Sequence, residues 1–409
     1  MKLLVIADDF TGAMDTGVQF SKRGVRTFVS TCTELNFNQI EENIQVLVID
    51  TESRHIPPRK AYDIVYRLAC AAREYGIQHV YKKIDSTLRG NTGQELKAVI
   101  DAWEGSPLMC IPAYPKTGRT TVNSIQFVDG IPLHQTIYSK DLLNPITTSC
   151  ISEILEKQPG IRAVAATVDG RLTSGLEDKD TVYIFDGQSD GDLINAGKIL
   201  SSRRKLFLMA GCAGFAEYLP DFIEFEKCGT GLEQVKSENI LVVSGSINED
   251  SIKQTLYGKL LGFESIVLTS EQKNTGGYME TARGKELAEE IAGAMARVGK
   301  VIIKTVNRRE EVDEVNDPVK IAGSLGALTN LILSCRVDCT VVVFGGDTAI
   351  HIMEAVECAG LFPVEEIVPG VAVACAVCKY GEFTLVSKAG GFGAEDVLLK
   401  IQDYLKGKG

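Results

Sequence analysis

The sequence predicts an α/β protein of two domains, each a mostly parallel sheet flanked by helices, with the active site in the cleft between the domains. The chain has 409 residues, which is long for one domain and comfortable as two. Short apolar runs typical of buried strands alternate with helical patterns along its whole length. The composition changes between residues 224 and 239, which predicts one domain at 1–230 and a second at 238–409.

The first half shows eight apolar runs of strand length, with helical patterns between them. Arg59 to Tyr75 is the clearest helix, because its apolar residues form one stripe, Pro58 precedes it and Gly76 follows it. The strands are predicted at Leu3–Ala7, Thr27–Ser30, Val46–Ile49, Val80–Ile84, Leu108–Ile111, Ala163–Val168, Val182–Phe185 and Leu206–Met209.

The second half repeats the pattern after a polar stretch. A second polar stretch, Ser270 to Thr281, is expected to be an exposed loop, because strands and helices resume on both sides of it. The strands are predicted at Ile240–Val243, Ser265–Leu268, Val301–Lys304, Thr340–Phe344 and Thr384–Val386.

The charge balance argues against nucleic acid as a partner. There are 43 basic and 54 acidic residues, a formal charge of -11, and no run rich in Lys or Arg. The first apolar run is too short for a membrane span or a signal peptide. Eleven cysteines, an odd number in mostly apolar segments, are typical of reduced thiols, so a cytoplasmic location is expected. The sequence leaves the oligomeric state open, a homodimer included.

Polar residues follow three predicted strands of the first half, where ligands bind in open α/β sheets. All three strand ends carry carboxylates and two add cations, a set that suits a polyhydroxy acid. Singly, each residue could instead serve the fold, with Asp9 as a helix cap or Ser86 as a turn former. The segment 112–120 is predicted to be an ordered loop, which could lie over this site or serve the fold alone. The candidate substrate ligands are Asp9, Arg54, Lys82, Lys83, Asp85, Ser86 and Arg89.

Glycine-bearing turns follow three predicted strands of the second half. Glycines there let backbone N–H groups approach phosphate oxygens, and a helix N-terminus adds a favourable dipole. The sequence has neither a P-loop nor a dinucleotide fingerprint. The candidate ligands of a nucleotide phosphate are Ser244, Gly345, Gly346, Asp347, Thr348, Gly390 and Gly391.

The chain resembles the four-carbon acid sugar kinases over essentially its whole length. The motifs that carry the resemblance are IADDFTGAMDTGVQ at 6–19, TESR at 51–54, KKIDSTLRGNTG at 82–93, IPAYPKTGRTT at 111–121, GCAGFA at 211–216, VSGSI at 243–247, FGGDTA at 344–349 and KAGGFG at 388–393. The resemblance implies an N-terminal domain that binds the acid and a C-terminal domain that binds ATP.

The resemblance also implies roles and a reaction. Asp9, Arg54 and the turn from Lys83 to Ser86 would contact the acid, and the glycine turns would contact ATP. The implied reaction transfers a phosphoryl group from ATP, with Mg²⁺, to the terminal hydroxyl of D-threonate. D-erythronate or another four-carbon acid is the alternative substrate, and an ATP-dependent ligase acting on the carboxylate is the alternative enzyme.

The catalytic residue is left open between two carboxylates. Asp9 and Asp85 are both candidates to orient or deprotonate the hydroxyl. Asp347 is a plausible magnesium or water ligand, but the sequence fixes no metal ligand.

Overall fold

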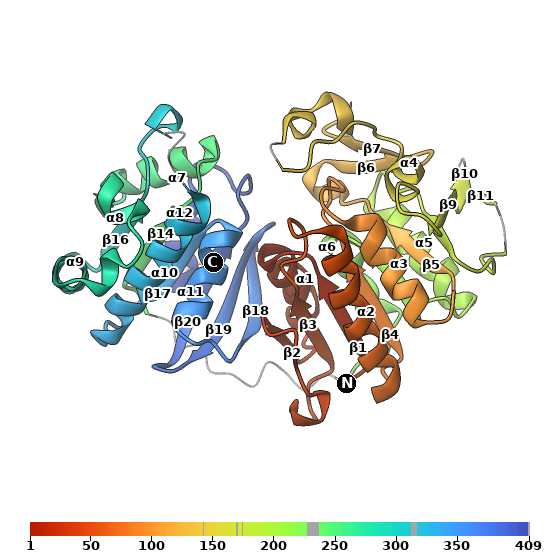
Figure 1. Ribbon diagram of the computed structural model, residues 1–409, viewed down its shortest axis with the longest axis horizontal. Coiled ribbons are helices and arrows are strands. Elements are labelled where there is room, and N and C mark those ends of the chain that lie inside the picture. Colours follow the sequence, from red (N-terminus) through yellow and green to blue (C-terminus); the bar gives the residue numbers. More distant parts are fainter. Residues whose placement is uncertain (142, 169–170, 174, 227–236, 312–316, 408–409) are drawn as a thin grey trace. The chain divides into compact units, whose positions relative to one another are not determined.

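The computed structural model describes residues 1–409 except for 142, 169–170, 174, 227–236, 312–316 and 408–409. The chain divides into two compact units, Met1–Thr230 and Gly231–Gly409. Residues 227–236, which fall in the predicted domain boundary, lie outside the described residues. Each unit has a sheet flanked by helices (Figure 1), so the predicted α/β class is confirmed.

The first unit is built on eight parallel strands within its described residues. Their order is β2-β3-β1-β4-β13-β5-β12-β9, and each neighbouring pair is parallel. The bounds are β1 Leu3–Ala7, β2 Thr27–Ser30, β3 Val46–Asp50, β4 His79–Lys83, β5 Leu108–Ile111, β9 Arg162–Ala165, β12 Thr181–Ile184 and β13 Leu208–Gly211.

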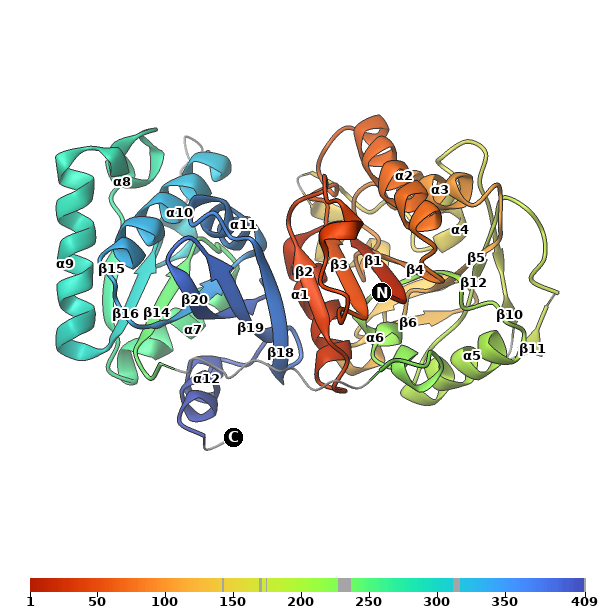
Figure 2. The ribbon, with the colours of Figure 1, turned by 90° about the horizontal axis from the view of Figure 1, so that it is seen from below.

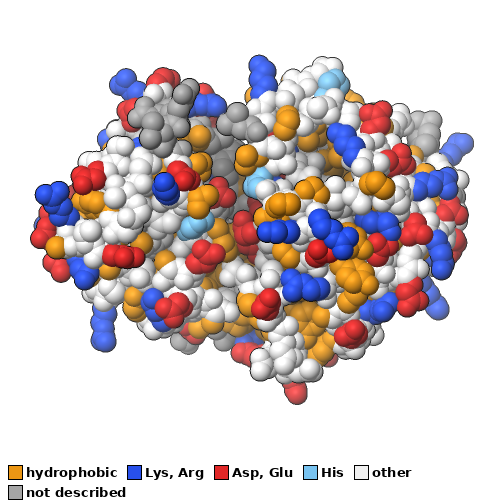
Figure 3. All heavy atoms as spheres, in the orientation of Figure 1, with side chains coloured by type: hydrophobic (Ala, Val, Ile, Leu, Met, Phe, Trp, Pro, Cys, Tyr) orange, Lys and Arg blue, Asp and Glu red, His pale blue; other side chains and the backbone are white. Residues whose placement is uncertain are grey.

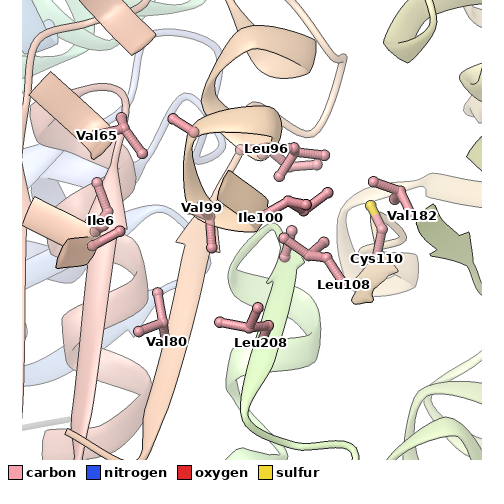
Figure 4. Packing of buried hydrophobic residues seen from close by; sticks show 14 of the residues in the cluster. Ile6, Val65, Val80, Leu96, Val99, Ile100, Leu108, Cys110, Val182 and Leu208 are labelled. Carbon is pink, nitrogen blue, oxygen red and sulfur yellow. The ribbon is translucent and has the colours of Figure 1, made fainter. Parts of the chain in front are cut away.

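Helices cover both faces of this sheet (Figure 2). The helices are α1 Phe10–Ser21, α2 Pro58–Tyr75, α3 Thr92–Ala102, α4 Ile151–Leu155, α5 Asp190–Ser202 and α6 Ala213–Ala216. The core on the α2 and α3 side joins alternate strand residues to the apolar stripes of these helices, for example Ile6 and Val80 to Val65 and Val99 (Figure 4). The predicted helix 59–75 is α2, which ends at Gly76 in the left-handed conformation.

Two small sheets lie outside the main one in the first unit. They consist of β6 Arg119–Val122, β7 Ile125–Val128 and β8 Ile131–Pro132, and of β10 Thr167–Val168 with β11 Arg171–Leu172. The loop predicted at 112–120 is therefore wrong at its end, because Arg119 and Thr120 pair with β7. That pairing depends on a partner strand that the local Pro and Gly content does not reveal.

The second unit has five parallel strands and an antiparallel extension. The order is β15-β16-β14-β17-β20-β19-β18, with β19 antiparallel to both of its neighbours, β20 and β18. The bounds are β14 Ile240–Ser244, β15 Glu264–Val267, β16 Lys300–Lys304, β17 Thr340–Phe344, β18 Gly360–Val368, β19 Val371–Cys378 and β20 Gly381–Lys388.

The helices of the second unit also lie on both faces of its sheet (Figure 2). They are α7 Glu249–Leu260, α8 Ser270–Asn274, α9 Ala282–Val298, α10 Pro318–Ser334, α11 Gly346–Ala355 and α12 Val397–Leu405. The exposed loop predicted at 270–281 is wrong for α8. Thr269 and Gln272 form a capping box that starts this short helix.

The strand order of each unit creates a switch point. In the first unit β1 lies between β3 and β4, and in the second unit β14 lies between β16 and β17. The chain leaves each central strand toward one side of the sheet and later crosses to the other, which opens a crevice at the carboxyl ends. These two strand ends are where ligands are expected.

No described helix is both long enough and apolar enough to cross a membrane. On the face seen in Figure 3, the described acidic and basic side chains are interspersed.

Candidate active site

Asp9 starts helix α1 directly after β1. Its Oδ1 accepts a hydrogen bond from the backbone N–H of Gly12 at 3.0 Å, and its Oδ2 accepts one from Thr11 Oγ1 at 2.7 Å. The helix-cap role that the sequence allowed for Asp9 is therefore present. The cap fixes the carboxylate at the switch point of the first sheet.

Lys83 ends β4 with its amine beside this cap. A Cβ atom built on Gly12 would collide with Asp9 Oδ1 and would lie 2.8 Å from Lys83 Nζ, so only glycine lets the helix start this close. Lys83 is 4% exposed, and its amine donates to the carbonyl oxygen of Ile84 at 2.8 Å. No carboxylate of the described residues lies within 4.0 Å of this amine, so it retains donors for a ligand.

Arg54 binds two carboxylates of the protein itself. Its Nε donates to Asp8 Oδ2 at 2.7 Å, while Nη1 and Nη2 form a fork on Asp9 at 2.9 and 2.7 Å. Burial would raise the pKa of Asp8, but Arg54, Lys82 and Lys83 together lower it. Arg54 thus holds the Asp9 carboxylate in place, and most of its fork is already occupied.

Asp85 and Arg89 form a second ion pair on the turn after β4. Arg89 Nε donates to Asp85 Oδ2 at 2.7 Å, and Nη2 donates to Oδ1 at 3.2 Å. Burial would raise the pKa of Asp85, but Arg89 and Arg54 outweigh it and hold that pKa well below its usual range. Ser86, on the same turn, is half-buried. Its backbone carbonyl oxygen accepts a hydrogen bond from Gln126 Nε2 at 2.9 Å.

Lys82 lies away from the other candidates. Successive strand residues point to opposite faces, and Lys82 points to the α3 side while Lys83 points to the α1 side. The Lys82 amine is fully buried and lies 3.1 Å from Glu95 Oε2. Burial is the main cause that raises the pKa of Glu95, although Lys82 opposes it. The structure therefore gives Lys82 a carboxylate partner inside the protein.

The structure adds buried carboxylates that the sequence did not single out. Asp8 belongs to the Arg54 cluster, and Asp50 ends β3 with its Oδ2 buried and without a hydrogen-bond partner among the described residues. Burial, with Glu52 and Asp9 nearby, raises the pKa of Asp50 well above its usual range. Glu95 could have been found, because it falls on the apolar stripe of the helix 92–102 with Val99.

The predicted glycine turns of the second unit meet at its switch point. Ser244 ends β14 and is 3% exposed. A Cβ atom built on Gly245 would collide with the hydroxyl of Thr348, so the turn after β14 packs against the start of α11. The backbone N–H of Gly345 donates to the carbonyl oxygen of Lys388 at 3.3 Å, which ties this turn to the end of β20. All three turns are therefore adjacent.

Lys388 supports the glycine loop that follows it. Its amine donates to Ser251 Oγ at 3.0 Å, to Gln254 Oε1 at 2.8 Å and to the carbonyl oxygen of Gly390 at 2.7 Å. Gln254 Nε2 in turn donates to the carbonyl oxygens of residues 392, 393 and 394. Burial lowers the pKa of Lys388 to about 7, and Asp250 opposes this shift. Helix α7 thus shapes the loop from beneath.

The remaining candidates of the second unit differ in their exposure to solvent. Asp347, in the first turn of α11, and Gly391 are exposed, while Gly346 and Gly390 are half-buried. Thr348 is 3% exposed and packs under the turn. This arrangement offers backbone N–H groups, a helix N-terminus and one exposed carboxylate on the same side of the sheet, which suits a phosphate chain.

Comparison with known proteins matches each unit to a domain family. Residues 3–219 match the family described as sugar-binding N-terminal domain, and residues 241–398 match the family described as nucleotide-binding C-terminal domain. A D-threonate kinase of Salmonella typhimurium is 29% identical, with 99% of each chain covered. A D-erythronate kinase of Heliobacterium modesticaldum is 25% identical, with 98% of this chain and 97% of the relative covered.

A third kind of relative and a solved structure extend the comparison. A 3-oxo-tetronate kinase of Pseudomonas savastanoi is 26% identical, with 98% of this chain and 97% of the relative covered. A crystal structure from Salmonella typhimurium, provisionally designated a tRNA synthase, has a TM-score of 0.81 at 21% identity and covers 98% of this chain and 99% of its own, which shows the common fold. The two domain families and the full-length relatives show that the chain belongs to the four-carbon acid sugar kinase family.

Proposed function

We propose that this protein is an ATP-dependent kinase that phosphorylates the terminal hydroxyl of a four-carbon sugar acid, with D-threonate as the preferred acid. The observation that carries the proposal is the full-length similarity to the Salmonella D-threonate kinase, at 29% identity. D-erythronate and 3-oxo-tetronate are the alternative acids, because relatives that carry those names are 25% and 26% identical.

In this proposal Lys83 binds the carboxylate of the acid. Its amine is at the switch point of the first sheet, beside Asp9, and among the described residues it donates to one acceptor, the carbonyl oxygen of Ile84. Arg54 acts as a positioning residue for Asp9, because its contacts go to Asp8 and Asp9. A charge-assisted contact with Lys83 also compensates the burial of the ammonium group.

Asp85 is the better of the two candidates to orient the hydroxyl. A carboxylate has about four acceptor positions. Asp9 accepts from Gly12, Thr11 and two nitrogens of Arg54, which fills them. Among the described residues Asp85 Oδ1 accepts a hydrogen bond from Arg89 alone, with Arg54 Nη2 at 4.0 Å, so it has room for a substrate hydroxyl. Phosphoryl transfer through a loose transition state asks for alignment more than for a strong base, so an ionised Asp85 of low pKa suits the role.

The glycine turns of the second unit would hold the nucleotide phosphates. The backbone N–H of Gly346 and the N-terminus of α11 favour negative charge. Mg²⁺ fits this donor set, because it is usually held by one or two carboxylates together with phosphate oxygens, and Asp347 is an exposed carboxylate there. Bound Mg²⁺ would supply neutralisation of the phosphate charge.

The test is ADP release with ATP, Mg²⁺ and each of D-threonate, D-erythronate, L-threonate and 3-oxo-tetronate. We expect ADP release that depends on the acid, and a phosphate monoester seen by phosphorus NMR. No ADP release with any of these acids contradicts the kinase proposal. An acyl phosphate, or a product that forms only with a second nucleophile, would favour the ligase instead.

A further inference from the structure

Lys304 ends β16 with a buried amine that has no hydrogen-bond partner. The residue is 2% exposed, and its Nζ is among the buried polar atoms without a partner in the described part of the chain. A buried ammonium group without a partner is costly, so such a group in a native protein usually has a protein group, a water molecule or an ion as its partner. Lys304 lies outside the motifs from which the site was predicted.

Strand register places this amine in line with the predicted phosphate turns. Lys304 pairs with Ser244, Ser244 pairs with Phe344, and Phe344 pairs with Lys388. In-register residues of neighbouring parallel strands point to the same face of the sheet. Lys304 therefore lies at the carboxyl end of its strand, immediately beside Ser244 at the switch point.

The two lysines of this row differ in what their amines can still bind. The Lys388 amine already has three acceptors in Ser251, Gln254 and Gly390, which is the full capacity of an ammonium group. The Lys304 amine has no acceptor among the described residues. Lys388 therefore shapes the glycine loop, whereas Lys304 has its donors free for an anion.

We propose that Lys304 is a ligand of the nucleotide polyphosphate and binds a phosphate oxygen beside the turn that follows Ser244. This inference rests on the proposed function and names a residue that the family motifs do not contain. A phosphate oxygen fits better than an uncharged acceptor, because it restores the charge balance of a buried amine as well as its hydrogen bond.

The charges around Lys304 predict a second measurable effect, the uptake of protons when ATP binds. Burial lowers the pKa of Lys304 to about 8; Lys259 of α7 lowers it further, and Glu311, in the short helical turn at Arg309–Glu311, opposes the shift. A phosphate oxygen next to the amine favours its charged form. At a pH of about 8.5, ATP binding should therefore take up protons through Lys304.

The experiment compares Lys304→Met with wild type and with Lys300→Met by calorimetry on the full chain. Lys300 lies at the other end of the same strand and is the matched control. For Lys304→Met we expect the Kd for ATP to rise about tenfold or more, which is the factor given by about 1.4 kcal/mol, with an unchanged Kd for adenosine. We also expect the proton uptake at pH about 8.5, measured in buffers of different ionisation enthalpy, to disappear. Lys304→Gln and the thermal midpoints of all variants check the fold.

Two results would overturn the inference: an ATP Kd within about twofold of wild type, smaller than the loss of one weak hydrogen bond, or an equal loss for adenosine. Inorganic tripolyphosphate separates this inference from the proposed function. If no four-carbon acid supports turnover but tripolyphosphate binding still weakens in Lys304→Met, the kinase proposal fails and the phosphate ligand stands. If turnover is present and Lys304→Met binds ATP normally, the kinase proposal stands and the proposed role of Lys304 fails.

Discussion

Two neighbouring lysines of β4 should respond to the same substitution in opposite ways. Lys83 is proposed to bind the acid carboxylate, and Lys82 pairs with buried Glu95 on the other face of the sheet. Lys83→Met removes one charge-assisted contact, worth about 1.5 to 3 kcal/mol. At about 1.4 kcal/mol per factor of ten, the KM for the acid should rise by roughly 10- to 150-fold. The KM for ATP should hardly change.

Lys82→Met should instead lower stability. Breaking a buried ion pair by removing one partner costs about 3 to 5 kcal/mol, because the other charge stays buried. For a unit of this size about 1 kcal/mol shifts the thermal midpoint by roughly 2 to 4 °C, so the first unit should melt about 6 to 20 °C lower. The double variant Lys82→Met with Glu95→Leu should recover part of this loss, since it removes both charges.

The measurements are a coupled ADP-release assay with the acid as the varied substrate and thermal unfolding followed by circular dichroism. The reasoning from strand register is refuted if Lys82→Met raises the acid KM as much as Lys83→Met while both variants melt at the wild-type temperature. A change of about twofold in KM corresponds to less free energy than the loss of one weak hydrogen bond. If the acid KM of Lys83→Met stays within about twofold of wild type, Lys83 does not belong to the proposed substrate site.

Three further predictions concern the other charged residues. Arg54→Lys keeps the charge but loses the fork on Asp8 and Asp9, so kcat/KM for the acid should fall about tenfold or more, by roughly 1.4 kcal/mol, while a fall in ATP affinity alone would contradict this role. Asp347→Ala should weaken ATP or Mg²⁺ binding in titration calorimetry and leave acid binding unchanged, because its carboxylate is exposed at the start of α11; unchanged ATP kinetics would count against it. The pKa of Lys388 is lowered to about 7, below the usual value near 10.5, so the unfolded state holds more protons between these values and stability should rise as pH rises from about 7 to 10. Lys388→Met should abolish this part of the pH dependence of the thermal midpoint, and an unchanged slope would contradict the assignment.

Local patterns were enough to predict most strands of both sheets. A short apolar run followed by a turn marks a buried parallel strand, and β1, β2, β5 and β17 have the predicted bounds. The run at 163–168 is less simple, since it divides into β9 and β10. Pairings such as β6 with β7 depend on contacts between segments, so the sequence could not supply them.

The candidate site shows the same division between local and tertiary information. Strand ends and glycine turns were enough to predict Asp9, Asp85 and the turn at Gly345 as residues of a ligand site. The opposite directions of Lys82 and Lys83 follow from strand geometry, but the partners of their amines do not. Lys388 belongs to a visible motif, yet its acceptors Ser251 and Gln254 lie more than 130 residues earlier in the chain. Only the folded chain shows that this amine is already occupied.

The alternation of Lys82 and Lys83 also limits how this segment can change in length. A one-residue deletion or insertion within β4 would exchange the two ammonium groups between the faces of the sheet. The amine of Lys83 would then leave its place beside Asp9, and the amine of Lys82 would leave Glu95. Substitution of Lys83 is expected to affect substrate binding, and substitution of Lys82 is expected to affect stability. A register shift of one residue in β4 would affect both. Changes in chain length that preserve function should therefore fall in the turns before and after this strand.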